Sequence, residues 1–448
     1  MISPFCFCGK DFYFRSMKVA IIYFLICFSI CGFAQTPYTS YFTGDVNDVT
    51  TSTQYGICLM GGATEDDNAM TWFLNKSGGG DIVVIRATGS NGYNSYLFSG
   101  LGVTVNSVET IVINSLAAAN DPYVRQQLRN AEAVFIAGGD QYDYVSYWKN
   151  TAVDSALNYL INVKHCPIGG TSAGMAIQGQ AYFSAAVSSI TSATALSNPY
   201  SAGVTIGNND FLHNPPLNRV ITDTHFDSPD RRGRLSVFLA RLFQDSAQAF
   251  YGIACDEYTA VCIDDLGIAK VFGGFPTYDD NAYFIQANCI LPNSPENCSN
   301  GQSLTWNRNN AALKVYQIKG DANATNSFDL NDWTTCSGGT WQNWYIDNGI
   351  ISYSLNTSAP SCIPTTMNEV QQHSDLLLYP NPVSSILNIS LNEIPKKIKV
   401  YNSTGILVAQ EKTIQELDFR NYANGMYFVK IELDGNSETK VQKIIVKH

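Results

Sequence analysis

The segment Gly-Thr-Ser-Ala-Gly at residues 170–174 is the clearest candidate for covalent chemistry in this sequence. It fits the Gly-x-Ser-x-Gly pattern, in which a sharp turn from strand to helix exposes a serine hydroxyl. Small neighbours are needed because such a turn is too tight for larger side chains. The pattern alone also fits a glycine-rich turn without a function. Ser172 is therefore a candidate nucleophile only if a base and its partners accompany it.

Two further polar segments each follow an apolar run. Ala-Gly-Gly-Asp-Gln (137–141) comes where the run 133–137 ends, and Asp-Thr-His-Phe (223–226) comes after the run 219–222. In an open α/β sheet, ligands gather at the carboxyl ends of the strands, so these loops could converge on one site. The first loop could offer backbone N–H groups to an oxyanion, and His225, the best placed of five histidines, could be the base. An ordinary turn and a structural histidine are the alternatives.

A pair of carboxylates, Asp256 and Glu257, stands at the end of another apolar run. A buried carboxylate can orient a catalytic histidine and stabilise its imidazolium form, whereas a surface acidic pair is the alternative interpretation. Arg231, Arg232 and Arg234 open a helix with an apolar stripe. They form a solvated helix face unless the substrate is an anion.

The elements that must position these residues follow from the hydrophobic pattern. Consecutive rather than alternating apolar positions suit strands that are covered on both faces, and these runs alternate with amphipathic segments. The runs are residues 55–60, 81–87, 108–114, 133–137 and 219–222, and the amphipathic segments include 69–74 and 145–161. The alternation predicts an α/β fold with a doubly wound, mostly parallel sheet. Beyond residue 251, the runs 258–263 and 268–272 indicate a hairpin, and later helices are hard to find.

The two ends of the chain differ from its middle. Residues 19–34 form an apolar run that is typical of a secretory signal peptide cut after Ala34. A transmembrane anchor is the alternative, but the run is shorter than the roughly 20 apolar residues that cross a bilayer. Alternating apolar residues near the C-terminus, with a turn at 434–435, predict a small antiparallel β-sandwich domain. The expected domains are a leader and signal peptide (1–34), an α/β domain (35–353), a linker (354–374) and the β-domain (375–448).

Composition narrows the classes of function. The formal net charge of −11 and the pI near 4.9 argue against nucleic acid or an anionic membrane surface as a partner. The sequence has no His-Glu-x-x-His or paired Cys-x-x-Cys, so we expect neither a metal nor another cofactor. Four of the twelve cysteines lie in the leader, and eight lie in the exported chain. We expect disulfides among Cys289, Cys298, Cys336 and Cys362.

Taken in order, the motifs resemble those of the cyanophycinase-like serine peptidases, the family that includes peptidase E. The resemblance runs from about residue 56 to residue 259. It covers Gly-Gly at 61–62, the 138–141 loop, Gly-Thr-Ser-Ala-Gly, Asp-x-His-Phe with trailing arginines, and Ile-x-x-Asp-Glu-x-Thr-Ala. It implies a fold like the class I glutamine amidotransferases, with serine replacing the cysteine nucleophile. It also implies Ser172 as nucleophile, His225 as general base and then acid, and Glu257 as the carboxylate that orients the histidine.

The same resemblance assigns the residues around this triad. The N–H groups of Gly139 and Ala173 would form the oxyanion hole. The implied substrate-binding residues are Asp140, Gln141, Thr224, Arg231, Arg234 and Thr259. Either Arg231 or Arg234 could pair with a substrate carboxylate, because a guanidinium matches that geometry. Relatives tend to dimerise, so a homodimer is possible.

Two positions depart from the family pattern. Thr224 stands where cyanophycinases usually carry glutamine, and Pro229 stands where the pattern has an arginine. Both departures concern substrate recognition. We therefore expect hydrolysis of peptide or isopeptide bonds at aspartyl or β-aspartyl residues, through an acyl-enzyme. The alternative is a non-catalytic surface protein that binds peptide or glycan, which the Cys- and Trp-rich segment 289–344 also fits.

The C-terminal domain carries a second resemblance. Leu-Tyr-Pro-Asn-Pro (378–382) and the segments 387–389, 399–405 and 425–429 look like the C-terminal sorting domain of the type IX secretion system of Bacteroidetes. This implies passage over the outer membrane by the type IX machinery, removal of the domain, and either release or attachment to surface polysaccharide. The mature protein would then be secreted or lie at the cell surface without a transmembrane anchor.

Overall fold

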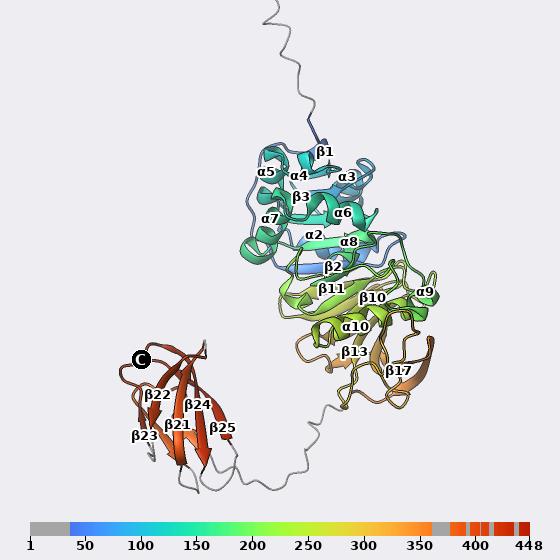
Figure 1. The fold of residues 1–448 in the computed structure, drawn as a ribbon. Helices are drawn as coiled ribbons and strands as arrows, with labels where there is room; N and C mark the ends of the chain where they lie inside the picture. The colour runs from blue at the N-terminus through green and yellow to red at the C-terminus, as the bar shows by residue number, and fades with distance from the viewer. Residues whose placement is uncertain (1–35, 361–376, 391–394, 404, 412–415, 434–438) are drawn as a thin grey trace, which may run out of the picture. The chain divides into compact units, whose positions relative to one another are not determined.

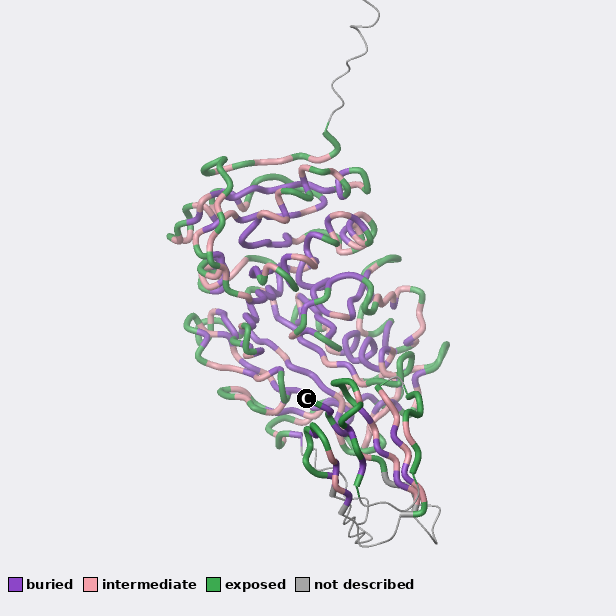
Figure 2. The backbone as a smooth tube through the Cα atoms, turned by 90° about the vertical axis from the view of Figure 1, so that its left-hand side faces the viewer, coloured by how far each residue is buried: buried purple, intermediate pink, exposed green. Residues whose placement is uncertain are grey.

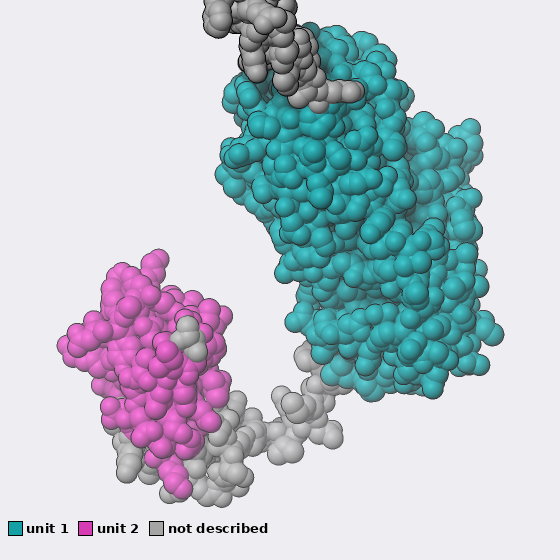
Figure 3. Space-filling model, turned by 45° about the horizontal axis from the view of Figure 1, so that its top comes forward, with its two compact units in different colours: residues 1–362 teal, residues 363–448 magenta. Residues whose placement is uncertain are grey.

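The computed structural model describes residues 36–360, 377–390, 395–403, 405–411, 416–433 and 439–448. They belong to two compact units, one within residues 1–362 and the other within residues 363–448 (Figure 1, Figure 3). Among the described residues, no helix is both long enough and apolar enough to cross a membrane. The expected signal peptide lies outside these residues.

A ten-stranded sheet forms one half of the first unit. Five of its strands are parallel neighbours, in the order β4 (Ser107–Val112), β3 (Asp81–Arg86), β5 (Ala133–Ile136), β6 (Ile168–Thr171) and β2 (Gly56–Met60). Antiparallel strands extend it on both sides: β1 (Thr39–Gly44) beyond β4, and β11 (Ala260–Asp264), β12 (Ile268–Phe272), β15 (Ser327–Asp329) and β16 (Cys336–Ser337) beyond β2. The strands β11 and β12 form the predicted hairpin.

Helices cover this sheet on both faces because successive side chains of its parallel strands enter different clusters. Ile57 and Val83 pack on the face of α5 (Pro122–Asn130) and α7 (Ala152–Tyr159). Cys58 and Val84 pack on the opposite face with α2 (Asp67–Asn75). Figure 2 shows long buried stretches of backbone running through this unit. Burial on both faces explains the consecutive apolar residues, and the prediction of a doubly wound arrangement is confirmed for this part.

The remaining helices of this half are short. They are α3 (Gly92–Ser95) with a π-helical turn (Tyr96–Gly100), α4 (Leu116–Ala119), α6 (Gln141–Trp148), a π-helical turn after α7 (Leu160–Lys164) and α8 (Ala173–Ala176). The amphipathic segment 145–161 therefore belongs to two helices rather than one. The break falls at Asn150, whose φ of 61° is incompatible with a continuous right-handed helix.

A second, eight-stranded sheet forms the other half of the unit. Its order is β18 (Ile350–Thr357), β17 (Thr340–Asp347), β14 (Leu313–Lys319), β13 (Asn281–Ala287), β10 (Tyr251–Cys255), β9 (Val220–Asp223), β7 (Ala181–Phe183) and β8 (Ile206–Asn208). Only β10, β9 and β7 are parallel. The helices of this half are α9 (Ser192–Ser197), a 3₁₀ turn (Pro215–Leu217) and α10 (Arg232–Ser246).

Two expectations are corrected by this sheet. The prediction of one mostly parallel sheet was wrong, because the run 219–222 contributes β9 to a second sheet that is antiparallel over most of its width. The predicted start of the linker at residue 354 was also wrong, because β18 pairs with β17 as far as Thr357. Apolar content identified the run that forms β9, but it does not reveal which neighbour a strand selects.

The second unit consists of two antiparallel sheets. One contains β19 (Leu377–Tyr379), β20 (Ile386–Ser390) and β23 (Glu416–Asp418), and the other contains β22 (Leu407–Glu411), β21 (Pro395–Asn402), β24 (Gly425–Leu433) and β25 (Thr439–Val446). Buried residues of both sheets, such as Leu387 and Val429, belong to one hydrophobic cluster. The prediction of a small antiparallel β-domain is confirmed, whereas the expected turn at 434–435 lies outside the described residues.

The cysteines that follow the expected leader have different states. Cys289 is disulfide-bonded. Cys298 and Cys336, which we expected to be disulfide candidates, carry free thiols, and Cys362 lies outside the described residues. Burial raises the pKa of the Cys298 thiol to about 11, so this side chain is a neutral apolar group of the core at neutral pH.

Candidate active site

Ser172 stands in a sharp turn between β6 and α8. Its φ of 51° and ψ of −115° lie outside the regions that ordinary residues adopt, as expected for a serine held exposed between a strand and a helix. Two glycines make this turn possible. A Cβ at Gly170 would lie 2.5 Å from the backbone of Gly174, and one at Gly174 would lie 2.1 Å from the carbonyl oxygen of Ile136.

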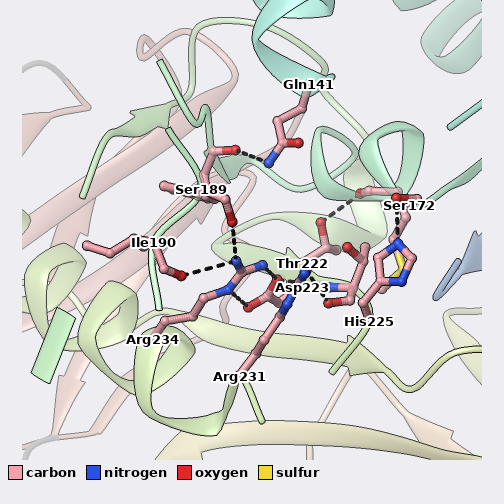
Figure 4. Close-up of polar contacts among 12 residues, drawn as sticks. Gln141, Ser172, Ser189, Ile190, Thr222, Asp223, His225, Arg231 and Arg234 are labelled. Carbon is pink, nitrogen blue, oxygen red and sulfur yellow. Dashed lines mark hydrogen bonds and ion pairs between the residues drawn. The ribbon is translucent and has the colours of Figure 1, made fainter. Parts of the chain in front are cut away.

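His225 follows β9 and reaches Ser172 from the second sheet. Its Nε2 lies 2.8 Å from the Oγ of Ser172 (Figure 4). On the other side of the ring, Nδ1 lies 2.6 Å from Oε1 of Glu257, which follows β10. A carboxylate can only accept, so Nδ1 carries the proton and Nε2 is free to accept from the serine hydroxyl. The histidine and glutamate side chains are 23% and 27% exposed, which leaves the site open to a substrate.

The segment 60–62, at the end of β2, holds all three loops in place through its backbone. The carbonyl oxygen of Met60 accepts from Ser172 N at 3.0 Å, and that of Gly61 accepts from His225 N at 2.8 Å. The carbonyl oxygen of Gly62 accepts from Tyr258 N at 3.1 Å, next to Glu257. The segment also lies so close to the Glu257 loop that a Cβ at Gly61 would lie 1.9 Å from the carbonyl oxygen of Asp256. A Cβ at Gly62 would lie 2.4 Å from the imidazole ring.

The loop 138–141 lies beside the serine, as expected. A Cβ at Gly138 would lie 3.6 Å from the Cβ of Ser172, and Gly139 is exposed. Asp140 caps α6, because its carboxylate accepts from Tyr142 N at 2.9 Å. Gln141 donates to the carbonyl oxygen of Phe183 at 3.5 Å. Ala173, the other residue expected in the oxyanion hole, is buried in the first turn of α8.

Three of the expected substrate ligands are buried. Arg234 is buried and pairs with Asp223, so its guanidinium fixes the strand before His225 and cannot take a substrate carboxylate (Figure 4). Thr224 and Thr259 are also buried, and the Thr259 hydroxyl donates to the carbonyl oxygen of Glu257 at 3.3 Å. These assignments are corrected because residue type indicated binding, whereas burial makes the side chains part of the scaffold.

Arg231 is the remaining basic candidate. It is half-buried and donates to the carbonyl oxygen of Thr224, the residue before His225, at 2.8 Å. Among the described residues it forms no ion pair, unlike Arg232 and Arg234. Burial and the neighbouring Arg234 lower the pKa of its guanidinium, so a negative group placed beside it would be stabilised.

Asp256 differs sharply from its neighbour Glu257. It is buried, its Oδ2 accepts from Nδ2 of Asn281 at 2.9 Å, and its Oδ1 has no hydrogen-bond partner among the described residues. Burial, followed by the nearby Asp227, raises the pKa of Asp256 to about 7. The two carboxylates are therefore not a surface acidic pair.

A cavity next to the Glu257 loop is lined by acidic residues. This cavity of about 680 Å³ adjoins Tyr258 and Thr64 and is lined by the carboxylates of Glu65, Asp66, Asp67 and Asp280. Within the described part of the chain, no cluster of three or more His, Cys, Asp or Glu side chains is arranged to hold a metal ion.

Comparison with known families identifies both parts of the chain. Residues 93–271 match the model of peptidase family S51, and residues 377–447 match that of the secretion system C-terminal sorting domain. The first unit is thus a peptidase-type domain that contains the site described above. The chain combines a domain of family S51, the peptidase E and cyanophycinase family, with a type IX sorting domain. The sorting domain indicates export and a secreted or cell-surface location.

Solved structures with detectable similarity are distant. A peptidase from an acI-B1 Actinobacterium is 13% identical, with 50% of this chain and 90% of that chain covered and a TM-score of 0.35. A putative peptidase E from Listeria monocytogenes EGD-e is 15% identical, with 50% and 98% covered and a TM-score of 0.31. PorZ, a surface component of the type IX secretion system of Porphyromonas gingivalis, is 12% identical, with 42% and 30% covered and a TM-score of 0.15. No curated protein matches the sequence.

Replacing Gly61 by alanine should separate the loops that this segment holds together. The new Cβ would overlap the carbonyl oxygen of Asp256, and we expect a loss of about 2–4 kcal/mol in the free energy of unfolding. Gly92→Ala is the matched control, because a Cβ there meets nothing within 4 Å. Urea unfolding of both variants measures the difference, and equal stabilities would contradict a close contact at Gly61.

Removing the charge of Arg234 should leave the buried carboxylate of Asp223 without its ion-pair partner. We expect Arg234→Met to cost about 3–5 kcal/mol, because an uncompensated carboxylate would remain in the core. Arg232→Met breaks the more exposed pair with Asp230 and should cost at most about 1 kcal/mol. A similar loss in both variants, measured by denaturant unfolding, would show that Arg234 is not buried with its partner.

Replacing Asp256 by asparagine should change how stability depends on pH. The raised pKa means that the folded protein disfavours the ionised carboxylate, so the wild type loses stability as the pH rises from about 4 to about 7. Asparagine cannot ionise. We expect Asp256→Asn to be more stable than the wild type by about 2–4 kcal/mol at pH 8, and the difference to shrink towards pH 4. A difference in stability that stays constant over this range would contradict a buried carboxyl group.

Proposed function

We propose that this protein is an exported serine-type peptidase of the cyanophycinase-like kind, with Ser172, His225 and Glu257 as its catalytic triad. One observation carries the proposal: an unbroken hydrogen-bonded series from the serine hydroxyl through both ring nitrogens to the glutamate. A merely structural serine does not need a strained turn that aims its hydroxyl at a correctly oriented imidazole. The family S51 match supports the same assignment.

The geometry supports an acyl-enzyme mechanism. Ser172 Oγ attacks the carbonyl carbon of the substrate while its proton passes to Nε2 of His225. Glu257 stabilises the resulting imidazolium through Nδ1–H. The protonated histidine then gives its proton to the leaving amine, and the acyl-serine ester forms. A water molecule, deprotonated by the same nitrogen, hydrolyses the ester and restores the serine.

The tetrahedral intermediate requires hydrogen-bond donors for its oxyanion. We assign this role to the backbone N–H groups of Gly139 and Ala173, because the 138–141 loop and the first turn of α8 flank Ser172. For substrates with an aspartyl or β-aspartyl residue, Arg231 is the proposed carboxylate ligand. Gln141 is a further proposed substrate contact. In this proposal the catalytic domain extends to Thr357, the end of β18. A homodimer remains a prediction. The hydrogen bonds within the proposed triad disfavour the non-catalytic alternative.

The decisive experiment uses the protein without its leader, α- and β-aspartyl dipeptides, and a mixed peptide library. We expect hydrolysis to fall by at least about 10³-fold in Ser172→Ala, because the nucleophile is lost. A fluorophosphonate should label the wild type at Ser172 and should fail to label His225→Ala. Arg231→Met should raise KM for aspartyl substrates with little effect on neutral peptides. Undiminished hydrolysis by Ser172→Ala would exclude the proposed mechanism.

A further inference from the structure

A series of polar side chains, all buried except the half-buried Gln317, crosses the second sheet and ends beside the proposed triad. It begins at Nε1 of Trp344 in β17, which donates to Oε1 of Gln342 at 2.8 Å. Gln342 donates to Gln317 in β14, and Nε2 of Gln317 donates to Oδ1 of Asn281 in β13 at 2.7 Å. Asn281 donates to Oδ2 of Asp256, directly before Glu257, at 2.9 Å. We call these five residues the amide relay.

The two ends of the amide relay fix the direction of every bond within it. An indole N–H can only donate, so Gln342 must present its oxygen to Trp344 and its NH₂ group to Gln317. The same orientation then propagates through Gln317 and Asn281. The far end must be an acceptor, and the Asp256 oxygen meets that requirement. The relay therefore has one consistent arrangement, in which all donors point towards Asp256.

The same tryptophan also reaches the histidine loop. Its ring stacks on Phe226, the residue after His225, with centroids 6.2 Å apart and planes 13° from parallel. It also contacts the ring of Tyr283 in β13 at 6.0 Å. Trp344 is 1% exposed, so it is fixed by the core on all sides. Trp344 thus contacts the loop of His225 directly through its ring. It is connected to the loop of Glu257 only through the hydrogen bonds of the relay.

The strands that supply the relay lie outside the matched peptidase segment. The family model ends at residue 271, whereas Asn281, Gln317, Gln342 and Trp344 all come later in the chain. The carboxylate of Glu257 has no described hydrogen-bond partner except His225. The position of Glu257 also depends on its backbone, which is held by Asp227 on the N–H group, by the Thr259 hydroxyl on the carbonyl oxygen and by Asp256 as the preceding residue. Asp256 N in turn donates to the carbonyl oxygen of Asn281 at 2.9 Å.

We propose that the amide relay is a positioning device, through which strands β13, β14 and β17 hold Glu257 and His225 at hydrogen-bond distance. This inference rests on the proposed function for its kinetic consequence but not for its geometry. The relay residues are positioning residues that act through Glu257. A displacement of Glu257 would leave Nδ1–H of His225 without its acceptor, and small displacements of catalytic groups are costly to the rate.

The test compares two glutamine-to-methionine variants of the full chain. Gln317→Met removes a donor and an acceptor from the middle of the relay. Gln286→Met is the matched control, because buried Gln286 in β13 donates to the carbonyl oxygen of Trp333 outside the relay. In Gln317→Met we expect the low-field NMR signal of the His225 Nδ1 proton to shift or vanish. Labelling by fluorophosphonate should fall about tenfold, with kcat reduced and KM unchanged. Gln286→Met should change none of these.

A second pair of variants covers the case in which Gln317→Met does not fold. Asp256→Asn keeps an oxygen that accepts from Asn281 and should retain the NMR signal, whereas Asp256→Ala should lose it. The NMR readout does not require turnover. Suppose that the signal shifts in Gln317→Met but the wild-type chain hydrolyses no peptide. This result would refute the proposed function and leave the positioning role intact. An unmoved signal in both Gln317→Met and Asp256→Ala would overturn the positioning role, whatever the activity.

Discussion

Three consecutive carbonyl oxygens at the end of β2 hold this site together. Met60, Gly61 and Gly62 accept from the backbones of the serine loop, the histidine loop and the residue after Glu257. These loops come from different strands, and two of them belong to the second sheet. The approach is possible only because residues 61 and 62 lack side chains, since a Cβ at either would overlap Asp256 or His225. The distances of under 3 Å within the proposed triad therefore depend on a backbone contact rather than on the three side chains themselves.

Around this contact the protein separates groups that support the site from groups that could meet a substrate. Asp223 and Arg234 form a buried pair behind His225, and Asp256 accepts from the amide relay behind Glu257. In front, Ser172, Gly139 and Arg231 remain at least partly accessible. Burying charged groups is costly unless each has a partner, so their retention here fits a requirement for geometry more than for stability. Export as a secreted or cell-surface protein then places the peptidase-type domain outside the cell.

Much of the fold was predictable because parallel strands covered on both faces leave a strong signal in the sequence. The runs that became β2, β3, β4 and β5 were all located, as was the hairpin of β11 and β12. The division into two sheets was not, because β9 has the same apolar character as those strands and only its neighbours distinguish it. The strands beyond residue 280 were not located from the sequence either, since their polar residues, including Gln317 and Gln342, face partners on other strands.

The sequence by itself determined the chemistry available to this protein: a serine in a glycine-flanked turn, a histidine, a glutamate and an export domain, each in a recognisable local pattern. Tertiary structure alone decided which of the neighbouring residues face the proposed site and which are buried behind it. Arg231 and Arg234 have the same residue type and are three positions apart, yet one stays free of ion pairs among the described residues and the other is buried against Asp223. Asp256 and Glu257 are adjacent, yet one is buried and the other faces His225. Burial and pairing depend on contacts between residues far apart in the chain, and local patterns do not encode such contacts.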